Sequence, residues 1–260
     1  MSKIKRDGHI HSPYCPHGSN DSFIQYIEEA IKKGIEEISF TEHIPMPNNF
    51  MDYEFIKDVA PNEEELNLYF KDLITLKEQY KDNIKINIGM EVDYIEGYED
   101  YIKNMLNKYG EVLEDGILST HFVKIENEHY CIDVIEGFEE ALKKIGSLER
   151  LYDKYFETLI KSIKSDLGEY KPKRIGHPTL IRIFNKKYPI NYKNTKLIDE
   201  VIDAIIENDY ESDFNVAGLR KEFCKEIYPS GYFYDEAVKK GVKMVYGSDA
   251  HCAKDLWSSY

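Results

Sequence analysis

Short apolar runs alternate with longer amphipathic segments along almost the whole chain. The short runs predict buried strands, which in parallel sheets are nearly continuous in apolar residues. They cover residues 4–9, 37–41, 84–92, 116–121, 174–176, 213–217 and 243–247. Between them, apolar residues recur with helical spacing, which predicts helices over residues 23–33, 63–80, 98–108, 136–165, 196–207 and 232–240. This alternation indicates an α/β protein with parallel strand pairing and right-handed crossovers.

Two folds fit that alternation, an open doubly wound sheet and a closed barrel. Six of the seven predicted strands are followed within a residue or two by a histidine or a carboxylate in a short polar motif. The carboxyl ends of a barrel form a ring around one mouth, where barrel enzymes have their active sites. We therefore expect a distorted (β/α)7 barrel, similar to a TIM barrel, as a single domain over residues 1–260.

The polar motifs contain seven of the eight histidines and two carboxylates. These residues are His9, His11, His17, His43, Glu91, His121, His177, Asp249 and His251. Histidine is the commonest metal ligand, and a tetrahedral zinc takes about four ligands, so nine residues predict two or three divalent ions. Glu91 ends a buried apolar run, where an ionised carboxylate is costly unless it is paired or metal-bound. We expect it to bridge two ions.

The spacing of two motifs strengthens the metal interpretation. His9 and His11 alternate along a strand and so share one face, and Asp249 and His251 have the same spacing at the other end of the chain. Barrel closure would make these two motifs neighbours. A lone histidine is more often a buried residue with satisfied hydrogen bonds, but a random distribution would not place seven of eight at strand ends.

Composition limits the possible partners and location. The net charge of −14 argues against nonspecific nucleic-acid binding, which needs cations for the phosphates. No apolar run approaches the roughly 20 residues of a membrane helix, and the first residues do not resemble a signal peptide. Four cysteines without a CxxC pair predict reduced thiols in the cytoplasm. Cys15 and Cys252 lie beside proposed ligands, and we interpret them as bystanders.

The motif order HxH, H, TEH, GxEVDY, SxH, GHP, NxAGLR, GSDAH resembles the polymerase-and-histidinol-phosphatase (PHP) superfamily. The segments TEHIPMP, GMEVDYIEGYE and NVAGLRKE resemble its monofunctional histidinol-phosphate phosphatases rather than its polymerase-associated domains. The resemblance runs from residue 6 to about residue 252, and no ligand position is substituted. It implies a trinuclear site and a phosphomonoesterase that converts L-histidinol phosphate to L-histidinol and phosphate in histidine biosynthesis.

The resemblance also implies how the ligands divide among the ions. One ion would be held by His9, His11, Glu91 and Asp249, a second by His17, His43 and His251, and a third by Glu91, His121 and His177. We expect Glu91, Asp249 and His251 to be catalytic, with a hydroxide that bridges two ions attacking phosphorus in line. Mixed nitrogen and oxygen ligands accept Zn, Fe or Mn.

Two arginines are the candidates for binding the phosphate. Arg220 follows the sixth predicted strand, the only one without a proposed ligand, and Arg182 lies five residues past His177. The planar guanidinium can donate two hydrogen bonds to one phosphate, and the resembled subgroup has two arginines in comparable places. Glu42 and Asp93 adjoin ligands and are candidates for orienting imidazoles or holding a substrate amine, and a structural role is an equal alternative for each.

Other interpretations remain open on the sequence alone. The same metallophosphatase could act on phosphotyrosine or a nucleotide, since substrate loops are less diagnostic than ligands. A non-catalytic metal-binding or regulatory domain is a second alternative, against which the intact ligand set and the two arginines argue. A structural zinc protein would need closed, cysteine-rich sites, which the dispersed histidines contradict. The sequence does not indicate the oligomeric state.

Overall fold

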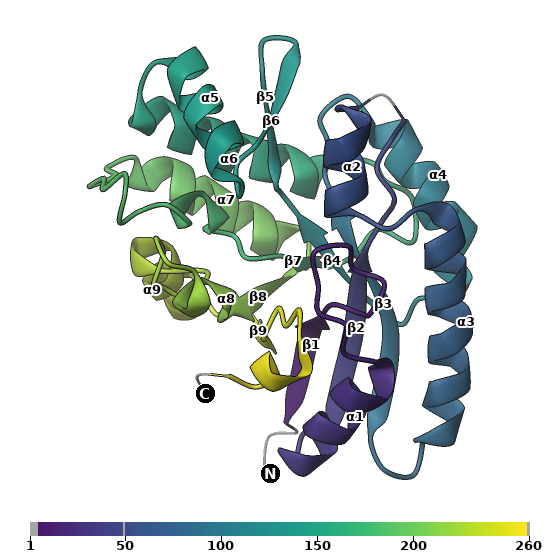
Figure 1. The fold of residues 1–260 in the computed structure, drawn as a ribbon. Helices are drawn as coiled ribbons and strands as arrows, with labels where there is room; N and C mark the ends of the chain where they lie inside the picture. Colours follow the sequence, from purple (N-terminus) through teal and green to yellow (C-terminus); the bar gives the residue numbers. More distant parts are fainter. Residues whose placement is uncertain (1–4, 49, 259–260) are drawn as a thin grey trace.

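Seven parallel strands form the centre of the molecule in the computed structural model, which describes residues 5–48 and 50–258. The strands pair in the order β1-β2-β3-β4-β7-β8-β9, so each pairs with the next strand of the sheet along the chain (Figure 1). Their bounds are β1 Arg6–Ile10, β2 Glu37–His43, β3 Lys85–Asp93, β4 Asp115–Ser119, β7 Arg174–Ile175, β8 Glu211–Asn215 and β9 Met244–Gly247. All seven predicted strands are confirmed to within about two residues at either end, although residue 4 lies outside the described part.

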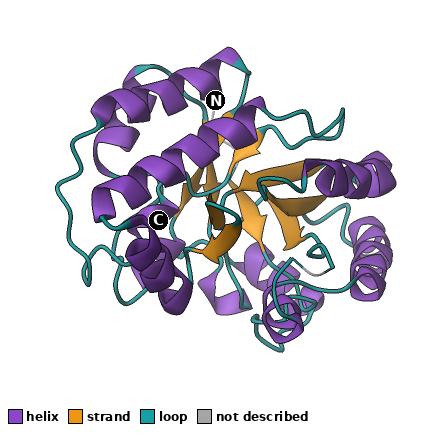
Figure 2. Cartoon of the chain, turned by 90° about the horizontal axis from the view of Figure 1, so that it is seen from above, coloured by secondary structure: helices purple, strands orange, loops and turns teal. Residues whose placement is uncertain are grey.

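The sheet closes on itself between β1 and β9. The amide of Asp249 donates to the carbonyl of His9 at 2.7 Å, and the amide of His11 donates to the carbonyl of Ala250 at 3.1 Å. Seen from above, the strands lie at the centre with helices around them (Figure 2). The expected seven-stranded barrel is thereby confirmed, with a seam held by a few bonds rather than a full ladder.

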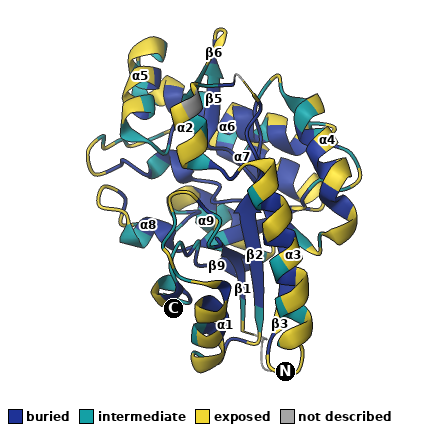
Figure 3. Ribbon diagram, turned by 45° about the vertical axis from the view of Figure 1, so that its right-hand side comes forward, coloured by how far each residue is buried: buried dark blue, intermediate teal, exposed yellow. Residues whose placement is uncertain are grey.

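Helices cover the outside of the barrel. They are α1 Phe23–Lys32, α2 Tyr53–Val59, α3 Glu63–Gln79, α4 Glu99–Tyr109, α5 Ile135–Ile145, α6 Leu148–Lys164, α7 Thr195–Glu207, α8 Ala217–Arg220 and α9 Gly231–Lys239, with single 3-10 turns at Gly110–Val112, Leu180–Arg182 and Ala253–Asp255. Their inner faces are buried against the strands and their outer faces are exposed (Figure 3). In α1, for example, Phe23 and Ile27 lie one turn apart and are buried, and Phe23 packs edge-on against Phe40 of β2.

Two features of the region between β4 and β7 differ from the prediction. The single helix expected over residues 136–165 is wrong, because Gly146 adopts a left-handed conformation that ends α5 and Ser147 then caps α6. The strands β5 Phe122–Ile125 and β6 Glu128–Cys131 form an antiparallel hairpin that was not predicted. Figure 1 shows this hairpin and α2 at the upper end of the barrel.

The sixth strand ends earlier than predicted. It covers Glu211–Asn215, so Ala217 begins the short helix α8 and Arg220 ends it. After β9 the described chain forms only the 3-10 turn Ala253–Asp255, which packs against α1. None of the helices described here is both long enough and apolar enough to cross a membrane.

Candidate metal centre

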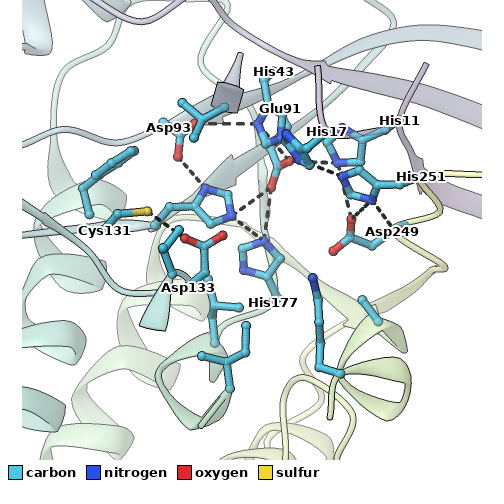
Figure 4. A pocket seen from close by; sticks show the side chains of 18 of the residues that line it. His11, His17, His43, Glu91, Asp93, Cys131, Asp133, His177, Asp249 and His251 are labelled. Atoms are coloured by element: carbon cyan, nitrogen blue, oxygen red, sulfur yellow. Dashed lines mark hydrogen bonds and ion pairs between the residues drawn. The ribbon is translucent and has the colours of Figure 1, made fainter. Parts of the chain in front are cut away.

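All nine predicted ligands converge on the carboxyl ends of the strands. His9 lies within β1, His43 ends β2 and Glu91 lies near the end of β3. The remaining six are in segments that follow strands, namely His11, His17, His121, His177, Asp249 and His251. Eight of the nine line a cavity of about 590 Å3, and the ninth, His9, is fully buried beneath it. Figure 4 shows the imidazoles turned toward Glu91 and Asp249.

The carboxylate of Glu91 lies between two groups of imidazoles. Its Oε1 atom is 3.1 Å from Nε2 of His177 and 3.8 Å from Nε2 of His121. Its Oε2 atom is 3.3 Å from Nε2 of His11 and 3.4 Å from Nε2 of His9. The side chain is only 1% exposed. A carboxylate with one oxygen directed at each group can bridge two cations, as the sequence predicted.

In three of the histidines, Nδ1 contacts a carboxylate outside the predicted ligand set, and this contact orients the ring. Nδ1 of His9 lies 2.7 Å from Asp213, Nδ1 of His11 lies 3.3 Å from Glu42, and Nδ1 of His121 lies 2.5 Å from Asp93. When Nδ1 donates its proton outward, the lone pair of Nε2 points into the centre, which is the usual arrangement around protein-bound metals. The expectation that Glu42 and Asp93 orient imidazoles is therefore confirmed.

In two pairs of histidines, the Nε2 atoms of the two rings face each other. His17 and His251 donate through Nδ1 to backbone carbonyls, which leaves their Nε2 atoms 3.0 Å apart. Burial, followed by nearby histidines, lowers the pKa of His17 to about 4, and the same causes hold the pKa of His251 well below its usual range, so that both lone pairs are present. Nε2 of His121 and His177 are likewise 3.1 Å apart. In the pair of His17 and His251, opposed lone pairs repel unless a cation lies near both, so this donor set fits a metal ion.

The buried carboxylates make the centre strongly favourable for positive charge. Burial alone lowers the pKa of His9, but the charges of Asp249, Glu91 and Asp213 outweigh it and raise that pKa to about 10. The Nε2 atom of His9 nevertheless has no hydrogen-bond partner, although the side chain is fully buried. A divalent ion would satisfy both the lone pair and the local excess of negative charge.

The ligand atoms form three groups, each compact enough to hold one ion. His9, His11 and Asp249 form the first, and Glu91, His121 and His177 form another. The third contains His43 and His251, as predicted, together with His11 and the thiol of Cys15. His17 lies beside this third group, since its ring centroid is 4.8 Å from that of His251 and 5.5 Å from that of His43.

The two predicted phosphate ligands lie in different surroundings. Arg220 lines the cavity, and its guanidinium donates to the carbonyls of Ser248 and Asp249 at 2.7 and 3.0 Å. Arg182 is not among the lining residues and instead makes a bidentate ion pair with Glu226 at 2.7 and 2.9 Å. A role for Arg182 in phosphate binding stays a prediction, and it would require this pair to open.

Comparison with known proteins agrees with this geometry. The model of the PHP domain family matches residues 7–217. The chain belongs to the PHP domain family. A histidinol-phosphatase of Bacillus subtilis is 44% identical over 98% of this chain and 97% of its own. The crystal structure of a proposed histidinol phosphatase from Listeria monocytogenes superposes with a TM-score of 0.93 at 34% identity, covering 98% of both chains.

A more distant structure shares the fold. It is that of a histidinol phosphate phosphatase from Lactococcus lactis in complex with zinc, L-histidinol and phosphate, with a TM-score of 0.67 and 20% identity over 98% of this chain and 89% of the other. The barrel fold is thus common to this chain and to both of these structures.

Two residues of the PHP site on β8 were not predicted. Asp213 holds His9, and the amide of Asn215 donates to Asp213 at 3.0 Å and to the ligand Asp249 at 3.1 Å. The segment Ser-Asp-Phe-Asn in a buried strand was the available signal, because polar side chains at alternate positions there must face partners.

Proposed function

We propose that this PHP protein is a metal-dependent phosphomonoesterase that hydrolyses L-histidinol phosphate to L-histidinol and phosphate. The observation that carries the proposal is the position of Glu91 between two imidazole groups, at the mouth of a cavity that Arg220 also lines. The 44% identical relative from Bacillus subtilis and the liganded structure from Lactococcus lactis support the choice of substrate.

We propose that two or three divalent ions (Zn, Fe or Mn) bind to His9, His11, His17, His43, Glu91, His121, His177, Asp249 and His251. Such ions supply a water molecule that is deprotonated near neutral pH, and they neutralise charge on the phosphate oxygens. Glu91 and Asp249 would hold neighbouring ions, while His251 and His17 would bind on the outer side of the centre. These roles agree with the three groups of ligand atoms and with the opposed Nε2 atoms.

The rest of the chain orients these groups and the substrate. Asp213, Glu42 and Asp93 hold three imidazoles so that each Nε2 lone pair points inward. Arg220 would direct a guanidinium N–H at the phosphate from the loop after β8, where it also fixes the backbone carbonyl of Asp249. We further propose that residues 1–260 are one domain and that the enzyme is cytoplasmic, where its four free cysteines would stay reduced.

The test is phosphate release from L-histidinol phosphate, measured beside phosphotyrosine, a nucleoside monophosphate and p-nitrophenyl phosphate. Bound metals are quantified on the same sample. We expect the highest kcat/KM on L-histidinol phosphate, with two to three metals per chain. A higher kcat/KM on another member of the panel would assign the metal centre to a different phosphomonoester, and absent metals would contradict the mechanism.

A further inference from the structure

The cavity above the metal centre contains charged groups that the centre does not use. Arg220 and Lys221, at the end of α8, provide positive charge. Four carboxylates besides Glu91 and Asp249 also line it, and two of them are already engaged, because Asp93 binds His121 and Asp255 pairs with Arg220. The other two are Asp58 on α2 and Asp133, two residues beyond β6.

Asp133 is the better placed of these two carboxylates. It is half-buried where the β5–β6 hairpin returns to the barrel, whereas the side chain of Asp58 is exposed. Figure 4 shows the carboxylate of Asp133 between Cys131 and His177, among the residues that line the cavity. A cation bound in front of Asp133 would therefore lie next to the metal centre rather than at the outer rim.

No described Lys or Arg makes an ion pair with Asp133 in this structure. Its carboxylate instead accepts a hydrogen bond from the thiol of Cys131, which donates to Oδ1 at 2.8 Å. Burial, followed by the charge of Asp133, raises the pKa of that thiol well above its usual range, so the thiol stays protonated and neutral. It can hold the carboxylate in place without neutralising it. The half-buried carboxylate lines the cavity and can therefore accept a cationic group of a ligand bound there.

The substrate of the proposed function has such a cation. L-Histidinol phosphate carries an ammonium group two carbons from its phosphate oxygen, and its imidazole ring lies on the next carbon. With the phosphate at the metal centre and Arg220, the ammonium would lie in the same cavity that Asp133 lines. Apolar side chains next to Asp133, among them Phe122, Val134 and Leu180, also line the cavity and offer contact for the ring.

We propose that Asp133 binds the substrate ammonium and selects phosphorylated amino alcohols over phosphomonoesters without an amine. This inference rests on the proposed function and assigns its substrate specificity to one side chain. Asp133 is a substrate-binding residue in this account, neither a metal ligand nor the acid that protonates the leaving alkoxide.

The test compares two substrates that differ only in the amine, L-histidinol phosphate and its deamino analogue imidazolylpropyl phosphate. A hydrogen-bonded charge pair of this kind is worth about 10- to 100-fold in kcat/KM, which is the preference we expect of the wild type for the aminated substrate. In Asp133→Asn the preference should disappear, while kcat/KM for the deamino analogue stays within about twofold. The amide oxygen of Asn can still accept from the thiol of Cys131.

Two further variants control for charge and for folding. Glu128→Gln removes the same charge from an exposed position on the same hairpin and should keep the wild-type preference. Asp133→Glu retains the charge and should restore part of the preference that Asn removes. Binding of the product L-histidinol, measured by calorimetry, should weaken in Asp133→Asn and be unchanged in Glu128→Gln.

Four results would overturn the proposal. An equal loss on both substrates in Asp133→Asn would indicate a role in proton transfer or in site geometry. A fall in bound metal would make Asp133 a ligand instead. An unchanged preference in Asp133→Asn, with the wild type active on L-histidinol phosphate, would refute the proposal while leaving the proposed function intact. A wild type inactive on L-histidinol phosphate but active on another phosphomonoester would refute both.

Discussion

Replacement of Glu91 by glutamine is the most direct perturbation of the metal centre. Glutamine preserves the size of the side chain but removes the negative charge and one of the two oxygens. In the wild type, these oxygens lie 3.3 and 3.4 Å from Nε2 of His11 and His9 and 3.1 Å from Nε2 of His177. The change therefore affects both ligand groups that Glu91 joins, without opening a cavity.

The expected magnitude follows from burial. The Glu91 side chain is 1% exposed, and interaction with the surrounding histidines, once burial is overcome, holds its pKa well below the usual range. Removing one partner of a buried charged cluster costs about 3–5 kcal/mol. At about 1.4 kcal/mol per factor of ten, the rate of phosphate release should fall by about 10²- to 10⁴-fold. We expect at least one bound metal to be lost as well.

The assay combines steady-state phosphate release with metal analysis of the same preparation. Ser119→Ala is the graded control, because Ser119 donates to Oε1 of Glu91 at 2.5 Å but belongs to none of the ligand groups. We expect it to lower kcat by about tenfold, the lower end of the cost of losing one hydrogen bond to a charged group. A Glu91→Gln enzyme with near-normal turnover and a full complement of metals would refute the bridging role.

Three further predictions concern the supporting residues and the ions. Asp213→Asn should lower metal affinity by about 10- to 100-fold, because the carboxylate orients His9. Titration with a chelator measures this affinity, and an unchanged value would refute the prediction. Asp115→Ala should lower the free energy of unfolding by about 3–5 kcal/mol, because it leaves the buried guanidinium of Arg174 without its carboxylate partner. Asp166→Ala, which breaks an exposed ion pair, should lower it by less than about 1 kcal/mol. Equal losses of the two variants in urea unfolding would contradict this difference. Removing the metals with a chelator should abolish activity and lower Tm, and re-addition of Zn or Mn should restore both. An unchanged Tm in calorimetry would argue against a structural contribution of the ions.

Much of the barrel could be predicted because its strands are buried on both faces and give continuous apolar runs. The hairpin β5–β6 could not, because its two strands have four residues each and its turn at Glu126 and Asn127 lacks the Asn-Gly signal of tight hairpins. The break between α5 and α6 was visible in principle. Gly146 followed by Ser147 is a stop signal and a start signal in succession, but the helical spacing on either side concealed it.

The ligands themselves were predictable because each lies in a short motif at the end of a strand. Their orienting partners were less so, since Asp213 lies 204 residues from His9 and meets it only when the barrel closes. Glu42 and Asp93 were found because they are sequence neighbours of ligands. The pairing of Arg182 with Glu226 illustrates the same limit, because a motif can place an arginine near a site without revealing which carboxylate it meets.

Barrel closure and metal binding depend on the same few residues. The hydrogen bonds that join β1 to β9 involve the backbone of His9, His11 and Asp249, and the side chains of these three form one ligand group. An ion held by that group ties the first strand to the last across the seam. Because these residues are far apart in an unfolded chain, the ion binds the closed barrel preferentially, and its binding free energy adds to the stability of the closed state. An ion bound there would thus reinforce the few hydrogen bonds of the seam.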